Sequence, residues 1–186
     1  NAMGVSETQQ DMLLRLELSP QDHHVLQRLC AKRDIDFLST PFDSDSLDLL
    51  VHDIKLTTLK IGSGDITNGP LLLQAAHANC NVILSTGMCD LKDVTAALEV
   101  LAFGFLNGDI KPSRAAFKAA FESPNGQALL QNNVSILHCT TAYPAPHEDV
   151  NLQAMDTLRE TFKMRVGLSD HTIGNAVSIA AVARGA

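Results

Sequence analysis

Short apolar runs alternate with amphipathic stretches along most of the chain. Runs of four to seven residues that carry few polar positions are typical of strands buried on both faces. Five such runs stand at 37–40, 59–63, 82–86, 134–140 and 166–169. Between them, apolar residues recur at helical spacing and follow good helix starts, such as Ser19-Pro20 and Asp43. The expected helices are 20–33, 43–52, 69–79, 90–103 and 151–162, with a last one from about 173.

Strands that alternate with helices predict a parallel sheet covered by helices. The fold class is therefore α/β, either a doubly wound sheet or a (β/α)₈ TIM barrel. Residues 104–133 form a longer connection than one helix needs, and they contain Pro112 and Pro124. We expect an extra excursion there, with helical pieces near 113–121 and 124–131.

Composition narrows the range of partners. The chain has 186 residues, 45% of them hydrophobic, and a net charge of −7, which argues against nucleic acid or an anionic membrane as a partner. It leaves room for a small anion, which one lysine and a few backbone amides can bind. The chain contains no run of 18 uncharged apolar residues, so no membrane span is predicted. The default expectation is a cytoplasmic protein.

The four cysteines form no CxxC pair, so we expect reduced thiols and neither a zinc clip nor a redox motif. They are Cys30, Cys80, Cys89 and Cys139. The leading Asn1-Ala2-Met3 is typical of a tag remnant ahead of a native Met3. Residues 4–186 are then the protein itself.

Polar side chains gather where each predicted strand ends. The strand ends read Ser39-Thr40-Pro41, Lys60-Ile61-Gly62-Ser63-Gly64-Asp65, Ser85-Thr86-Gly87, His138-Cys139-Thr140-Thr141 and Ser169-Asp170-His171. A TIM barrel builds its active site at the carboxyl ends of its strands. The pattern therefore predicts one shared polar pocket, although Thr40, Ser85 or Thr172 alone is equally consistent with a helix N-cap.

Three residues of this set are chemically distinctive. Lys60 stands between Leu59 and Ile61 in an apolar strand, where an unpaired lysine is rarely buried. His171 follows Asp170, and a carboxylate can orient an imidazole for acid–base or metal chemistry. His138 lies inside an apolar run, which favours a core histidine bonded to backbone over a catalytic one.

Five motifs, in order, resemble those of the phosphoenolpyruvate-dependent sialic acid synthases (N-acetylneuraminate synthases) and their legionaminic and pseudaminic acid relatives. They are FLSTPFD, LKIGSGDITN, VILSTGM, LHCTTAYPAPHEDVNL and VGLSDHT, and the resemblance extends from about Thr8 to Ala186. It implies a (β/α)₈ catalytic barrel followed by a small antifreeze-like domain. It also implies condensation of phosphoenolpyruvate with N-acetylmannosamine or a related N-acetylated amino sugar, with release of phosphate.

The resemblance also assigns roles. Phosphoenolpyruvate is expected to contact Thr40, Lys60, Ser63 and Ser85, and Ser169 to bond its carboxylate. The sugar is expected to contact Asp65, Thr141 and Tyr143. His171 is expected to be one of two histidine ligands of a divalent metal, typically Mn²⁺, with Mg²⁺ or Co²⁺ as alternatives. Lys60, Asp65 and His171 are thus the expected catalytic set. Asp65 in place of a family Glu predicts altered sugar specificity, and Thr141 in place of Asn is a shorter side chain that can still donate a hydrogen bond.

Counting βα units gives barrel strands three to seven. We therefore expect an incomplete barrel, without the antifreeze-like domain and without the second metal histidine, and inactive as an isolated chain. Its open sheet edges predict a homodimer. Two alternatives remain: a catalytically silent module that binds a ligand or partner, and an aldolase that forms a Schiff base on Lys60.

Overall fold

The computed structural model describes residues 8–106 and 108–186, and the chain divides into two units, Asn1–Phe37 and Leu38–Ala186. The predicted tag residues 1–3 lie outside the described residues. In the described residues no helix is both long enough and apolar enough to cross a membrane.

The first unit contains two helices, α1 (Gln9–Leu16) and α2 (Pro20–Lys32). Each begins with a capping box. The hydroxyl of the cap residue accepts from the backbone amide three residues later, and the carboxylate of that later residue accepts from the backbone amide of the cap residue. The pairs are Thr8 with Asp11 and Ser19 with Asp22. Helix α2 confirms the prediction for 20–33, whereas α1 was not predicted.

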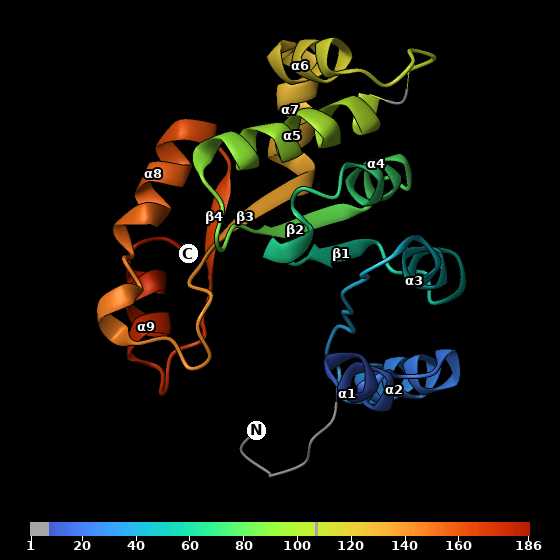
Figure 1. Cartoon of the computed structure of the whole chain (residues 1–186), viewed down its shortest axis with the longest axis vertical. Helices are drawn as coiled ribbons and strands as arrows, with labels where there is room; N and C mark the ends of the chain where they lie inside the picture. The colour runs from blue at the N-terminus through green and yellow to red at the C-terminus, as the bar shows by residue number, and fades with distance from the viewer. Residues whose placement is uncertain (1–7, 107) are drawn as a thin grey trace. The chain divides into compact units, whose positions relative to one another are not determined.

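The second unit is built on a parallel sheet in the order β1-β2-β3-β4 (Figure 1). The strands are β1 (Thr58–Ile61), β2 (Asn81–Ser85), β3 (Val134–Cys139) and β4 (Arg165–Ser169). These bounds agree with four of the predicted strands to within two residues, and they confirm the α/β class. Each strand pairs with the one before it in the chain, as Ser85 pairs with Leu137 and Cys139 with Ser169.

The connecting helices also agree with the predictions. They are α4 (Gly69–His77), α5 (Leu91–Leu106), α8 (Gln153–Phe162) and α9 (Ala176–Ala183). Figure 1 shows α4, α5 and α8 along one side of the sheet. Two short 3₁₀ turns, η2 (Ser63–Asp65) and η3 (His147–Asp149), were not predicted. Because η2 begins at Ser63, β1 ends at Ile61 and not at residue 63 as expected.

The predicted strand at 37–40 is wrong. Those residues form no strand, and β1 pairs only with β2. A four-residue strand needs a ladder partner and a covered apolar face, but Leu38 is 45% exposed and the boundary between the two units falls beside it. The helix expected at 43–52 forms as α3 (Ser44–Asp48), which continues into a π-helical turn, η1 (Leu49–Asp53).

The expected excursion between β2 and β3 is present. It holds α6 (Arg114–Glu122) and α7 (Pro124–Asn133), which share Ser123 as the end of one helix and the N-cap of the next. The excursion packs on α5, where the Phe103 and Phe117 rings meet edge to face with centroids 5.0 Å apart. A Cβ on Gly126 would overlap the Ala120 carbonyl oxygen, so this tight turn requires glycine.

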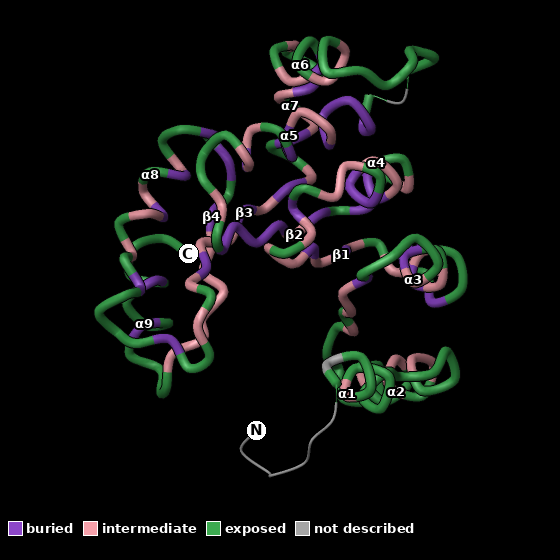
Figure 2. The backbone as a smooth tube through the Cα atoms, viewed as in Figure 1, coloured by how far each residue is buried: buried purple, intermediate pink, exposed green. Residues whose placement is uncertain are grey.

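The core lies between the sheet and its helices. Figure 2 shows buried positions clustered along the strands and on the helix faces that meet them. In β1 and β2 the fully buried side chains are Leu59, Ile61, Val82 and Leu84. Because strand side chains alternate between faces, the residues between these point to the opposite face of the sheet.

Candidate active site

The face of the sheet opposite the core carries the predicted chemistry. Parallel pairing keeps paired residues on one face, and the register joins Lys60 to Ile83, Ser85 to Leu137 and Cys139 to Ser169. The strand parity therefore brings Lys60, Ser85 and Ser169 to the same face. It adds Cys139, which had no predicted role there.

Lys60 is half-buried on this face. Its Nζ donates to the Ile61 carbonyl oxygen at 3.4 Å. Burial lowers the pKa of the Lys60 ammonium, and the nearby Cys139 thiol partly offsets this because a thiolate would attract the charge. The ammonium is thus poorly solvated, as a phosphate-binding or a nucleophilic lysine would be.

Ser85 has the most unusual environment. Its side chain is 2% exposed, and its Oγ has no hydrogen-bond partner among the residues that the structure describes. Buried hydroxyls are normally satisfied, so an orphan one indicates a place for a ligand or water. The N-cap alternative is wrong for Ser85, because Asp90 accepts from the first amides of α5.

The N-cap alternative is wrong for the other two hydroxyls as well. Asp43 caps α3 by accepting from Ser46, so Thr40 is not the cap. Asn175 stands at the N-cap position of α9, and the Thr172 hydroxyl donates to Asp170 instead. Thr40 lies in the extended stretch before α3, outside the sheet.

Three strand ends converge on Gly87. A Cβ built on Gly87 would overlap Thr141 Oγ1 and would stand 3.1 Å from both Cys139 Sγ and Ser63 Oγ. Two predicted site residues, Ser63 and Thr141, therefore lie together although 78 positions separate them (141 − 63). The space is available because residue 87 has no side chain.

Substitution of Gly87 tests this convergence. We expect Gly87→Ala to lower the free energy of unfolding by about 1–3 kcal/mol, because overpacking forces the Thr141 loop to move. Urea denaturation measures this loss. The matched control is Gly62→Ala, since a Cβ there meets nothing within 4 Å and its φ is −68°. Equal stability of the two variants would contradict the convergence.

Asp65 and Tyr143 are the two other residues of the predicted sugar side. Asp65 is the last residue of the turn η2, which begins at Ser63, and it is half-buried. Its main-chain oxygen accepts from the Asn68 amide at 2.9 Å. Tyr143 is 72% exposed, and its ring centroid lies 4.4 Å from that of His171. The predicted sugar-side tyrosine and the predicted metal histidine are thus neighbours.

His171 is held in one tautomer. Its Nδ1 lies 3.0 Å from the Thr140 carbonyl oxygen, which can only accept, so Nδ1 carries the proton. Nε2 is then the nitrogen with a lone pair, as a metal ligand requires. The expected pairing of His171 with Asp170 is wrong, because the Asp170 carboxylate accepts from Thr172 and Ser178 instead. The Ser178 hydroxyl bond is the main cause that lowers the pKa of Asp170.

A metal would need ligands in addition to His171. Among residues 8–106 and 108–186, no three His, Cys, Asp or Glu side chains gather closely enough to hold an ion.

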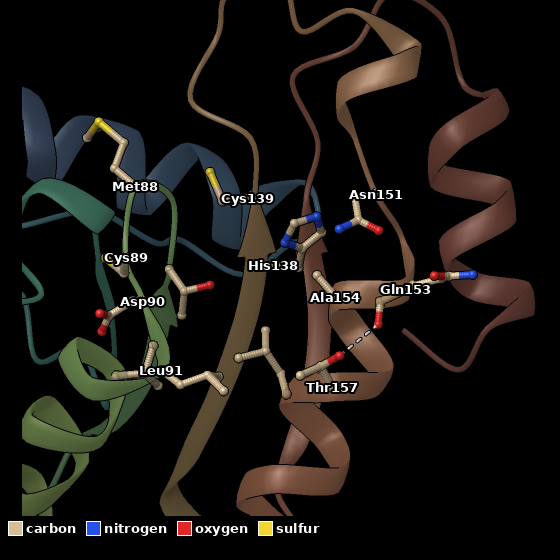
Figure 3. A pocket seen from close by; sticks show the side chains of 13 residues that line it. Met88, Cys89, Asp90, Leu91, His138, Cys139, Asn151, Gln153, Ala154 and Thr157 are labelled. Atoms are coloured by element: carbon tan, nitrogen blue, oxygen red, sulfur yellow. Dashed lines mark hydrogen bonds between the residues drawn. The ribbon is translucent and has the colours of Figure 1, made fainter.

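His138 is a structural residue, as its apolar setting predicts. Its Nε2 lies 2.5 Å from the Val150 carbonyl oxygen. Figure 3 shows the His138 ring and the Cys139 sulfur on different sides of β3. His138 faces a groove of about 770 Å³ between the amino ends of α5 and α8, which is lined by Asp90, Asn151 and Thr157 among others. Lys60, Ser85 and His171 do not line this groove.

The comparisons with known proteins agree with these motifs. The sequence model of the NeuB family matches residues 1–186. The N,N'-diacetyllegionaminic acid synthase of Campylobacter jejuni is 43% identical over 97% of this chain and 47% of that protein. The enzyme of the same name from Legionella pneumophila is 40% identical over 97% of this chain and 45% of that protein.

Solved structures give the same result. The N-acetylneuraminic acid synthetase of Leptospira borgpetersenii, crystallised with citrate, superposes with a TM-score of 0.71 and 32% identity over 91% of this chain and 50% of that one. The spore coat polysaccharide biosynthesis protein spsE of Bacillus subtilis gives a TM-score of 0.72 at 28% identity over 91% of this chain and 41% of that one. The chain spans about half the length of the curated relatives it matches. On this evidence the chain belongs to the NeuB family of sialic and related nonulosonic acid synthases.

Proposed function

We propose that this chain contributes the phosphoenolpyruvate-binding wall of a nonulosonate synthase active site. The enzyme would condense phosphoenolpyruvate with N-acetylmannosamine or a related N-acetylated amino sugar. The single observation that carries this proposal is the orphan Ser85 hydroxyl, buried on the same sheet face as Lys60. A hydroxyl and a poorly solvated ammonium together suit a phosphorylated carboxylic acid.

In the proposed site, Lys60 supplies positive charge to the phosphate. Hydroxyls of Ser63, Ser85 and Thr40 donate to the remaining phosphoenolpyruvate oxygens, and Ser169 donates to the carboxylate. Such bonds to charged oxygens are shorter and stronger than neutral ones. The methylene carbon of phosphoenolpyruvate forms a bond to the aldehyde carbon of the sugar, whose oxygen takes up a proton, and a water adds to the carbon that bears the phosphate. The C–O bond between that carbon and the bridging oxygen then breaks, and phosphate leaves with that oxygen.

Asp65, Thr141 and Tyr143 form the proposed sugar side. The exposed Tyr143 ring offers an apolar face with a polar tip, and Thr141 offers a donor that is shorter than an asparagine. Asp65 offers an acceptor for sugar hydroxyls. These contacts hold the open-chain aldehyde against the methylene carbon of phosphoenolpyruvate.

His171 fits a transition-metal ligand because the Thr140 carbonyl fixes its tautomer. Mn²⁺ is the proposed ion, and imidazole suits it better than it suits Mg²⁺. When bound, a divalent ion polarises the aldehyde and positions a water. The ion's remaining ligands would come from other parts of the complete active site.

Ser85→Ala separates binding from folding. Because the Ser85 hydroxyl is unpaired, we expect its removal to leave the free energy of unfolding unchanged or to raise it by about 1 kcal/mol. Phosphoenolpyruvate binding, measured by calorimetry, should weaken about tenfold, since one bond to a charged group is lost. The matched control is Ser135→Ala, two register positions lower on the same face.

Loss of stability in Ser85→Ala with unchanged phosphoenolpyruvate binding would contradict the proposal. So would equal weakening of binding in Ser135→Ala. The first result would make Ser85 a packing residue, and the second would show that its effect on binding is not specific to the proposed contact.

The lowered pKa of Lys60 also suits the alternative, a Schiff-base aldolase. Borohydride reduction in the presence of pyruvate distinguishes the two chemistries. The proposed synthase forms no imine, so Lys60 should gain no mass. A covalent adduct on Lys60 would favour the aldolase.

A further inference from the structure

The segment that carries His171 is the connection between β4 and α9. The main-chain oxygen of His171 accepts from the Ala145 amide at 2.9 Å, and Ala145 and Thr172 form an isolated parallel bridge. Its imidazole is held by the Thr140 carbonyl oxygen. The segment is therefore fastened on the β3 side, through both backbone and side chain.

On the other side, it is fastened by the carboxylate of Asp170. Oδ1 accepts from the Thr172 amide at 2.9 Å and from the Thr172 hydroxyl at 2.8 Å. Oδ2 accepts from the Ser178 hydroxyl at 2.5 Å. Asp170 thus joins the end of β4 to the first turn of α9 across the position of His171.

Helix α9 has no ordinary side-chain cap. Asn175, at the N-cap position, makes no capping hydrogen bond, and Gly174 reverses the chain at a φ of +89°. Ser178 lies in the first turn of this helix. The Asp170–Ser178 bond is the contact that ties the open helix start to the strand end.

We infer that Asp170 is a positioning residue for His171, and that it acts as a hydrogen-bond anchor of the loop rather than as the charged partner of the imidazole. The sequence alone favours the opposite role, because Asp170 and His171 are adjacent. The structure favours the anchor: among the described residues the His171 Nδ1 bonds to the Thr140 carbonyl oxygen, and the hydrogen bonds of the Asp170 carboxylate are with Thr172 and Ser178.

The variant Asp170→Asn distinguishes a role of Asp170 as a hydrogen-bond anchor from a role of its negative charge. An amide oxygen accepts from the Thr172 amide and hydroxyl as a carboxylate oxygen does, and the amide NH₂ donates to the Ser178 hydroxyl. Asp170→Asn therefore keeps every anchoring contact and removes only the charge. Asp170→Ala removes both.

The experiment is NMR on the chain itself. The His171 imidazole Hε1–Cε1 signal is assigned by its disappearance in His171→Gln. We expect Asp170→Ala to shift that signal by more than its linewidth and to speed hydrogen exchange of the Thr172 amide about tenfold, because that amide loses its acceptor. Asp170→Asn should restore both observables to the wild-type values. Asp45→Ala, at an exposed position of α3, is the control for loss of one carboxylate.

An unchanged His171 signal in Asp170→Ala would overturn the inference. Equal changes in the spectra of Asp170→Asn and Asp170→Ala would show that the charge of Asp170, and not its hydrogen bonds, affects His171. That result would also overturn the inference. If Asp170→Ala does not fold, Ser178→Ala decides, because it deletes one anchoring bond from an exposed position. An unshifted His171 signal in Ser178→Ala would then overturn the inference.

The positioning role serves the proposed metal site, but its test does not depend on that site. A chain that never binds Mn²⁺ would still show the His171 shift in Asp170→Ala. Failure of the synthase proposal and failure of the anchor thus give different results.

Discussion

In a preparation of this protein that turns over phosphoenolpyruvate, Lys60→Ala should raise the Michaelis constant for phosphoenolpyruvate about 10- to 100-fold. The reason is the loss of charge-assisted bonds to phosphate, which contribute about 1.5–3 kcal/mol. The Michaelis constant for the amino sugar should change little, because the proposed contacts of Lys60 are with the phosphate alone. Initial-rate kinetics with each substrate varied in turn measure the difference.

Lys92→Ala is the control for this experiment. Lys92 is exposed in the first turn of α5, so this substitution removes the same charge at a position outside the proposed site. Equal increases in both Michaelis constants after Lys60→Ala would remove Lys60 from the phosphate role. A similar effect of Lys92→Ala would reduce the role of Lys60 to long-range electrostatics.

His171→Ala should abolish manganese-dependent phosphate release, with a loss on the order of 100-fold or more, because the metal would lose an imidazole ligand. The fold should survive, since His171 lies at a strand end and contributes no buried apolar surface to the core. A phosphate-release assay over a range of Mn²⁺ concentrations, with a thermal melt of the same sample, measures both quantities.

His77→Ala provides the matched control, because His77 is exposed at the end of α4. Full manganese-dependent turnover in His171→Ala would show that His171 is no ligand. Loss of activity together with a lowered melting temperature would instead assign it a structural role.

Much of the fold follows from local patterns. The four strands of the sheet are apolar runs whose buried residues alternate, and several helices of the chain begin at recognisable caps such as Ser19 and Asp43. The prediction failed at 37–40, where the same kind of run lies beside a unit boundary and finds no strand partner. Strand formation depends on a neighbour that a local pattern does not contain.

The site was predictable as a set of strand ends, but its internal contacts were not. Adjacency in sequence suggested that Asp170 orients His171, whereas the Thr140 carbonyl does so from another strand end. Ser85 also reads as a helix cap until Asp90 is seen to take that position. Long-range partners of this kind follow from register and loop conformation, which residue types alone do not encode.

Two features of the site had little or no signal. Cys139 lies on the sheet face of Lys60 and Ser85 because it is paired with Ser169 in register, whereas its sequence context suggests only a core thiol. Gly87 is a glycine after a strand, which fits many turns, yet a Cβ at this position would crowd three site residues. Strand register would have predicted the first of these, but only after the pairing was known.

The helical excursion between β2 and β3 has a consequence for how the sheet closes. Before the helices form, joining β2 to β3 requires closing a chain segment of residues 86–133, about twice as long as the segment 140–164 between β3 and β4. Loop-closure entropy grows only with the logarithm of length, so this doubling costs about 0.6 kcal/mol. Burial of Leu130, which is fully buried in α7, is worth more than that by itself. The sheet therefore carries α6 and α7 with almost no added loop-closure penalty, and each strand still adds to the one that precedes it in the chain.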